Sequence, residues 1–277
     1  MLELAIEAAR AAGAVAMRYF EQGVPVETKP DRTPVTRADR EAEALIREMI
    51  AARFPGHHFL GEELGGDRSM DGNVWIIDPI DGTKNFVRGL PFFATQLAFY
   101  VDGEPVLGVS FAPALDELLA AARGKGTTFN GSESRVSRIT NVGDAFVLHG
   151  GLDVFDQQRA LPGLVELGRK AMSIRGHGDF YGYHLLARGK VDVMVEASIA
   201  PWDVAALRVI VTEAGGRFTN MAGGDPTLLS NSLATNSLLH DEVVATLRGE
   251  GARGRLGDEA NWGVWYRSQI GKSPCAR

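Results

Sequence analysis

The sequence predicts a mixed α/β (α+β) fold, with a mainly antiparallel sheet in the first half and helices layered against a second sheet. Short β-rich runs joined by tight turns occupy residues 94–130, which is typical of successive hairpins. From residue 145 onward, strand-like runs alternate with longer runs of helical periodicity. The 277 residues fit one large domain or two closely packed halves.

Two helical segments open the chain. Apolar residues recur on one helical face over residues 2–21, which predicts an amphipathic helix. Residues 29–34 are polar and flanked by prolines, so we expect a loop there. Thr36 then starts a second helix, and Asp39 lies three residues later, which fits a capping interaction.

Strands and turns follow. Residues 75–77 predict a buried strand that ends at Asp78, because Pro79 fixes its own φ and lacks an N–H. We expect a mobile loop at 65–73 and a hairpin turn at 102–103. Further strands of the first sheet are expected at 94–101, 105–112, 118–122 and 127–130. The second half is expected to contain strand 145–149, helix 156–170, strand 172–174, helix 179–188, strand 191–196, helix 202–214, strand 216–220 and helix 238–247.

Composition and charge narrow the function classes. A net charge of −6 argues against general nucleic-acid binding and would repel a phosphate ester unless cations offset it locally. The single cysteine, Cys275, allows no intrachain disulfide, and we see no zinc-type Cys/His cluster. No apolar run is long enough for a membrane span, and the N-terminus does not resemble a signal peptide. We therefore expect a cytoplasmic protein.

The segment after the strand at 75–77 gathers oxygen ligands. Asp78 and Asp81 lie three residues apart, with the backbone carbonyl of Ile80 between them. Gly82 and Thr83 then offer backbone N–H groups and a hydroxyl. Such a group suits a hard cation beside a phosphate. The alternative is a turn in which the two aspartates only cap the next element.

Two distant segments carry further carboxylates. Glu62 and Glu63 follow an apolar run, and alone they would indicate a solvated surface. Asp203 follows Trp202 in the first turn of an expected helix, where the helix dipole alone favours an acid.

Together, the segments 61–63, 78–83 and 202–206 resemble the motifs of the inositol monophosphatase superfamily of magnesium-dependent phosphatases. The resemblance covers about residues 1–248 and implies an alternating α-β-α-β-α sandwich. It implies a phosphatase domain over 1–248, with halves at about 1–140 and 141–248, and leaves 249–277 as a tail.

The resemblance also implies a ligand set for two or three Mg²⁺ ions per subunit. Glu62, Asp78 and the Ile80 carbonyl would bind one ion. Asp78, Asp81 and Asp203 would bind a second, with Asp78 bridging. Such ions activate a water and stabilise the leaving oxygen.

Catalytic roles follow from the same resemblance. Glu62, Thr83 and Asp39 are the expected catalytic residues, with Asp39 holding Thr83 or the attacking water by a hydrogen bond. The backbone amides of Gly82 and Thr83 would bind the phosphate. The capping role of Asp39 is compatible with this one.

Three segments are most similar to the histidinol-phosphate phosphatase branch of the family: 83–89, 178–180 and 235–242. Asp179, Glu196 and Asp203 are the expected contacts to the non-phosphate part of the substrate. A carboxylate beside aromatic rings suits the ammonium and imidazole of L-histidinol phosphate. Asp179 could instead be a helix N-cap, and Phe180 and Tyr181 could be core residues.

The resulting hypothesis is a Mg²⁺-dependent phosphomonoesterase that converts L-histidinol phosphate to L-histidinol in histidine biosynthesis. An inositol-1-phosphate phosphatase or a broad sugar-phosphate phosphatase is the alternative within the class. An alternative from another class is a non-catalytic protein that binds RNA polymerase or RNA. The resemblance also suggests a homodimer that acts on a small phosphate monoester, without nucleic acid or membrane.

Overall fold

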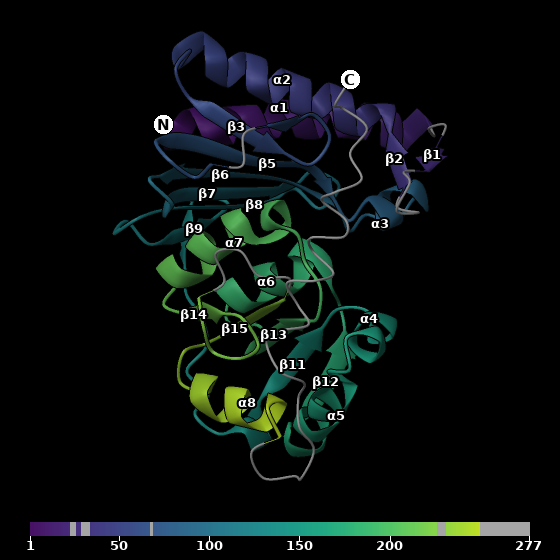
Figure 1. The fold of residues 1–277 in the computed structure, drawn as a ribbon, viewed down its shortest axis with the longest axis vertical. Coiled ribbons are helices and arrows are strands. Elements are labelled where there is room, and N and C mark those ends of the chain that lie inside the picture. Colours follow the sequence, from purple (N-terminus) through teal and green to yellow (C-terminus); the bar gives the residue numbers. More distant parts are fainter. Residues whose placement is uncertain (23–25, 29–33, 67–68, 226–230, 250–277) are drawn as a thin grey trace.

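The computed structural model describes residues 1–22, 26–28, 34–66, 69–225 and 231–249. Figure 1 shows five stacked layers: a helix pair, a large sheet, a second helix pair, a smaller sheet and an outer layer of helices. The predicted α-β-α-β-α sandwich is confirmed. None of the helices in these ranges is both long and apolar enough to cross a membrane.

The outer helix pair consists of α1 (Leu2–Gln22) and α2 (Arg37–Arg53), close to the predicted bounds. Small buried residues, including Ala5, Ala9 and Ala12, allow α1 to lie close to its neighbours. In the segment that connects the two helices, β1 (Val26–Thr28) and β2 (Pro34–Thr36) pair antiparallel. The expected loop at 29–34 lies outside the described residues except for its last position.

The large sheet has the strand order β10-β9-β8-β7-β6-β5-β3-β4 and is antiparallel except between β3 and β5. Its strands are β3 (His58–Gly61), β4 (Gly65–Gly66), β5 (Asn73–Asp81), β6 (Ala94–Val101), β7 (Glu104–Ala112), β8 (Glu117–Ala122), β9 (Thr127–Phe129) and β10 (Ser132–Ser134). The predicted antiparallel hairpins are confirmed. The expected loop at 65–73 was partly wrong, because its first two residues pair with β3 as an edge strand.

The second half contains a five-stranded mixed sheet of order β12-β11-β13-β15-β14. Its strands are β11 (Phe146–His149), β12 (Ser173–Gly176), β13 (Val193–Glu196), β14 (Arg217–Thr219) and β15 (Ser232–Thr235). The associated helices are η1 (Val142–Asp144), α4 (Leu152–Gln157), α5 (Leu161–Lys170), α6 (Asp179–Ala187), α7 (Pro201–Glu213) and α8 (His240–Leu247).

Two predictions for this half were wrong. The expected helix over 156–170 is divided into α4 and α5, because Arg159 has a left-handed backbone (φ 58°) and Pro162 begins a new helix. Strand β15 was not expected, since its four residues show no β-branched run apart from the final Thr235. Strand β15 is nevertheless an interior strand of the sheet, because β13 and β14 both pair with it.

The inner helices α6 and α7 lie between the two sheets (Figure 1). Along β5, Trp75 and Ile77 face the outer helix pair, while Val74 and Ile76 pack on the side of α7. Gly108 on β7 permits the close approach of α7, since a Cβ there would lie 2.3 Å from the Ala206 carbonyl oxygen. The sheet and the start of α7 are therefore in direct backbone contact.

We predict that Gly108→Ala destabilises the fold by about 1–3 kcal/mol, because the added methyl group must push α7 away from the sheet. Urea denaturation would measure the loss. Gly56→Ala is the matched control, because its Cβ would meet nothing within 4 Å, and we expect a change within about 0.5 kcal/mol. Equal stability of the Gly108 variant and the wild type would contradict the close packing.

Candidate active site

The end of β5 directs two carboxylates toward α7. Asp78 continues the alternation of Val74 and Ile76 and so faces α7. Asp78 pairs with Gln96 and Asp81 pairs with Ala94 on β6. Between these pairs, Pro79 and Ile80 on β5 therefore oppose the single residue Thr95 on β6, a bulge that returns Asp81 to the same face as Asp78.

The expected end of this strand at Asp78 was wrong. The chain continues as β5 through Pro79 to Asp81. Pro79 occupies the irregular part of the pairing, where its missing N–H breaks no ladder hydrogen bond. Both carboxylates are almost fully buried, with 2% of Asp78 and 7% of Asp81 exposed.

Electrostatics show that the predicted acidic residues converge. Burial raises the pKa of Asp78 well above its usual value, and the charges of Glu62, Asp81, Asp203 and Asp39 raise it further. Burial also raises the pKa of Asp81, and the charges of nearby carboxylates raise it further. Those carboxylates are Asp179, Asp203 and Glu196.

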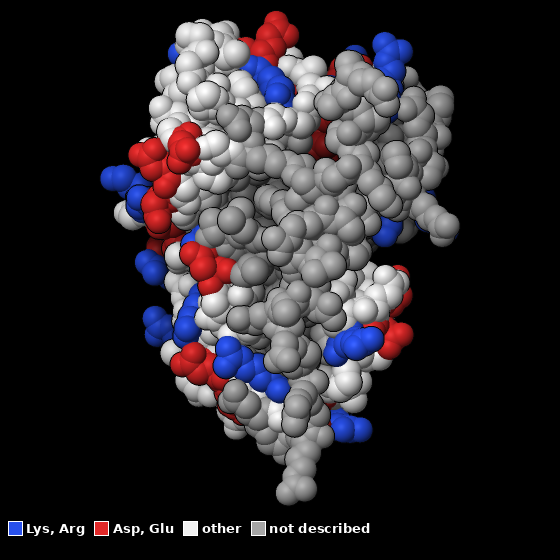
Figure 2. Space-filling model, in the orientation of Figure 1, with Lys and Arg blue, Asp and Glu red and all other residues white. Residues whose placement is uncertain are grey.

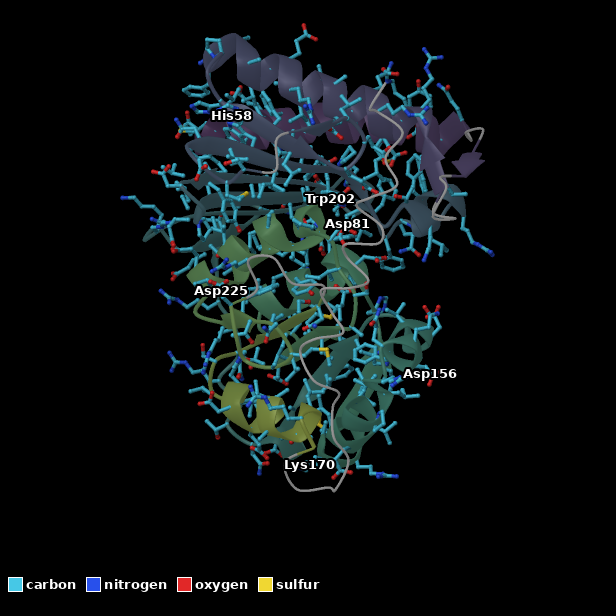
Figure 3. The ribbon with its side chains drawn as sticks, in the orientation of Figure 1. His58, Asp81, Asp156, Lys170, Trp202 and Asp225 are labelled. Carbon is cyan, nitrogen blue, oxygen red and sulfur yellow. The ribbon has the colours of Figure 1, made fainter. Side chains whose placement is uncertain are left out.

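Asp203 lies in the first turn of α7, at the junction where Figure 3 places Trp202 beside Asp81. It is the acid in the first turn of α7, where the helix dipole was expected to favour it, and its Oδ2 atom accepts a hydrogen bond of 2.7 Å from the Ala200 N–H. Its charge also acts on Asp78 and Asp81. The two interpretations of this residue therefore hold together.

Glu62 lies in the turn that follows β3. The buried Glu43 carboxylate of α2 holds this turn by accepting N–H bonds from Glu63 (2.8 Å) and Leu64 (3.2 Å). Arg47 pairs with Glu43 at 2.6 Å. The sequence analysis missed Glu43, whose only signal was an acid on the apolar side of a helix.

We predict that Glu43→Gln speeds hydrogen exchange at the Glu63 and Leu64 amides and lowers stability by about 1–3 kcal/mol, because a charged acceptor is lost. Exchange measured by NMR would test this prediction. Glu166→Gln is the control, since Glu166 forms only a solvent-exposed pair with Arg169. Unchanged protection of the two amides would exclude this role for Glu43.

The helix α3 (Thr83–Val87) follows β5 directly. Gly82 precedes it with a left-handed backbone (φ 85°), and a Cβ there would lie 2.6 Å from the Phe92 carbonyl oxygen. The Thr83 hydroxyl donates to the Ile80 carbonyl at 3.0 Å, and the expected role of Asp39 toward Thr83 or the attacking water stays a prediction. Asp39 is buried in the first turn of α2.

The start of α6 links the acidic residues to one another. The Phe180 N–H donates to Asp81 Oδ2 at 2.8 Å, and the Asp179 N–H donates to Glu196 Oε1 at 3.1 Å. Asp179 Oδ2 accepts from Asn85 Nδ2 at 3.0 Å. Asp179 is not the N-cap, because Gly178 holds that position and Asp179 has a φ of 55°.

Glu196 is buried beside this turn. Burial raises its pKa to about 8, with further contributions from the charges of Asp179 and Asp203. The Tyr183 hydroxyl donates to Glu196 Oε2 at 3.0 Å. The carboxyl of Glu196 is thus held from two sides.

Three rings meet beside Asp179. Phe92, His177 and Tyr181 contact one another, with ring centroids 5.1–5.4 Å apart. His177 is exposed, and the other two are half-buried. Phe180 is instead a core residue, as its alternative interpretation held. The sequence analysis missed Phe92, although it follows the central motif closely.

The donor set fits a hard divalent cation, because it consists of carboxylate and carbonyl oxygens without Cys or His. In the described ranges, no three His, Cys, Asp or Glu side chains are already arranged to hold a metal ion. Asp81 and Asp203 instead accept hydrogen bonds from backbone N–H groups. The mutual repulsion within the cluster is the observation that favours a cation.

The comparisons agree with this architecture. The chain matches the model of the inositol monophosphatase family over residues 1–252. It is 42% identical over 253 residues to a histidinol-phosphatase of Mycobacterium tuberculosis, covering 89% of this chain and 96% of the relative. A histidinol-phosphatase of Chlorobaculum parvum is 39% identical over 256 residues, covering 92% and 98%.

One solved structure and one further relative are also similar over most of the chain. The IMPase of Thermotoga maritima has a TM-score of 0.81 at 36% identity, covering 89% of this chain and 96% of that one. The Nus factor SuhB of Escherichia coli is 33% identical over 258 residues, covering 90% of this chain and 96% of the relative.

The five-layer fold with buried acids at the junction of sheet and helices defines a phosphoric monoester hydrolase. The chain belongs to the inositol monophosphatase family, whose members are metal-dependent phosphatases that generally use Mg²⁺.

Proposed function

We propose that this protein hydrolyses L-histidinol phosphate to L-histidinol and phosphate with Mg²⁺. The observation that supports the proposal is the position of Asp179, Glu196 and three clustered rings directly beside the Asp78–Asp81 carboxylates. A phosphate site next to acids and aromatic rings suits a substrate with a phosphate at one end and a flat cation at the other. The names of the relatives in M. tuberculosis and C. parvum agree with this substrate.

The proposed ligands divide between two ions, each of which would be bound by hard oxygens. Glu62, Asp78 and the Ile80 carbonyl would hold one, and Asp78, Asp81 and Asp203 the other. When bound, Mg²⁺ supplies charge that activates water and stabilises the leaving oxygen. Without a cation, the buried acids repel a phosphate dianion, so the chain by itself cannot bind its substrate well.

The remaining roles belong to the chain's own groups. The Gly82 and Thr83 amides would hold the phosphate oxygens at the start of α3. Thr83 would position the attacking water, and the buried Asp39 would act with it once the hydroxyl leaves the Ile80 carbonyl. Glu62 would orient the same water from the turn after β3.

The other end of the substrate would meet Asp179 and Glu196. These carboxyl groups offer negative charge to an ammonium or imidazolium. A cation bound there would lower the pKa of Glu196 from about 8 and so favour its ionised form. Phe92 and Tyr181 offer ring faces for the imidazole. An inositol phosphate has neither a cation nor a flat ring to use these contacts.

We predict that Tyr181→Leu raises the KM for histidinol phosphate about three- to tenfold, because a stacking contact of this type contributes about 0.5–1.5 kcal/mol. Steady-state kinetics would measure the change. Glycerol 1-phosphate, which has no ring, is the control substrate, and its KM should not change. A shift of equal size for both substrates would remove the rings from substrate recognition.

A phosphate-release panel with and without Mg²⁺ tests the proposal itself. We expect histidinol phosphate to be cleaved fastest and chelation of Mg²⁺ to abolish turnover. Asp78→Asn should lower kcat at least about 100-fold, because a bridging ligand is lost. Asp156→Asn, an exposed change on α4 that is labelled in Figure 3, should have no effect.

Faster cleavage of inositol-1-phosphate would overturn the substrate assignment. Full biological function in the inactive Asp78→Asn protein would favour a non-catalytic role, which the relationship to a Nus factor brings into view. On the face shown in Figure 2, Lys and Arg side chains are interspersed with Asp and Glu side chains along the edges of the part that the structure describes. Two or three Mg²⁺ ions per subunit and a homodimer complete the proposal and derive from the family resemblance. The proposed cytoplasmic location derives from the sequence pattern of the chain.

A further inference from the structure

Gln96 lies directly behind the acidic cluster. It is the register partner of Asp78 on β6, and only 1% of it is exposed. Its Nε2 atom donates to Asp81 Oδ2 at 2.6 Å and to the Asp203 carbonyl oxygen at 3.0 Å. One neutral amide therefore connects the end of β5 to the first turn of α7.

The orientation of this amide is dictated by its partners. In the observed contacts both partners are oxygen acceptors, so a flipped amide would place Oε1 against Asp81 Oδ2 and the Asp203 carbonyl oxygen. In the observed orientation, the buried Oε1 atom has no hydrogen-bond partner among the described residues. Leaving such an atom unpaired costs about 1–3 kcal/mol, so the amide is a poor choice for stability alone.

The hydrogen bonds also distinguish the two oxygens of Asp81. Oδ2 accepts from both Gln96 and the Phe180 N–H, whereas Oδ1 accepts no hydrogen bond from the described residues. Both donors are neutral, so they orient the carboxyl group without placing a positive charge where a cation would bind. Its rotation about χ2 is restricted, and Oδ1 is the oxygen that stays available for a cation.

We propose that Gln96 is a positioning residue for the divalent cation: it fixes the Asp81 carboxylate and the N-terminal turn of α7 relative to each other. The inference rests on the metal site of the proposed function. Residues that support metal ligands in this manner typically change metal affinity 10–100-fold when they are removed. Gln96 acts through Asp81 and Asp203 and does not itself touch the substrate.

The test uses the full chain and measures Mg²⁺ binding directly by isothermal titration calorimetry. Gln96→Leu should weaken Mg²⁺ binding about tenfold and raise the Mg²⁺ concentration for half-maximal activity by the same factor. The KM for the phosphate ester at saturating Mg²⁺ should stay within about twofold. The urea midpoint should not fall, since the variant also removes the unpaired Oε1.

Thr127→Val is the matched control. Thr127 Oγ1 donates to the Ile210 carbonyl at 2.6 Å, so it also ties the large sheet to α7, but far along the helix from Asp203. We expect it to lower stability and leave Mg²⁺ affinity unchanged. Gln96→Met, which keeps the length of the side chain, serves as a second variant if the leucine variant does not fold.

The outcomes distinguish a failure of the proposed metal site from a failure of the positioning role of Gln96. A wild-type chain that takes up no Mg²⁺ overturns the proposed metal site and this role with it. A wild type that binds Mg²⁺, with Gln96 variants that bind it equally tightly, overturns the positioning role alone. Equal weakening of Mg²⁺ binding by Thr127→Val would show a general effect of loosening α7 and would also overturn it.

Discussion

The constraint that shapes the rest of the structure is the electrostatic repulsion among carboxylates that lie buried close together. Asp78 and Asp81 lie where the large sheet meets two helices; burial raises both pKa values, and neighbouring acids raise them further. The fold offsets part of this cost with neutral donors, since N–H groups of the α6 turn and Gln96 point at Asp81. The donors orient the acids without neutralising them, and the remaining charge is what a cation would compensate.

The helices and sheets around the cluster are arranged so that these buried acids lie close together. The two inner helices, α6 and α7, begin at the cluster and run between the sheets, so their first turns supply backbone groups and an acid to one place. The contact of Gly108 with Ala206 brings α7 against the sheet without an intervening side chain. From the outer helix pair, Glu43 reaches through to hold the turn that carries Glu62.

Periodicity was sufficient to predict the layers, most helices and the hairpins, because these elements bury apolar residues at regular intervals. It failed for β15 and for the break between α4 and α5, where tertiary pairing and a single left-handed residue decide the structure. In the site, motifs located the acids but not their partners. Gln96 and Glu43 lie on elements other than those of the groups they bind, and Phe92 meets its ring partners His177 and Tyr181 only in the folded chain. No local sequence pattern marks such a residue.

The bulge in β5 has a consequence for how this segment can vary. Asp78 and Asp81 share a face, three positions apart, because one surplus residue separates them relative to the pairing with β6. Deleting a single residue between them would restore a regular ladder in which the two acids, now two positions apart, still share a face and keep their partners Gln96 and Ala94. The surplus residue is therefore not needed to align the two acids; what it adds between them is a further backbone carbonyl, and that of Ile80 accepts the Thr83 hydroxyl at the start of α3.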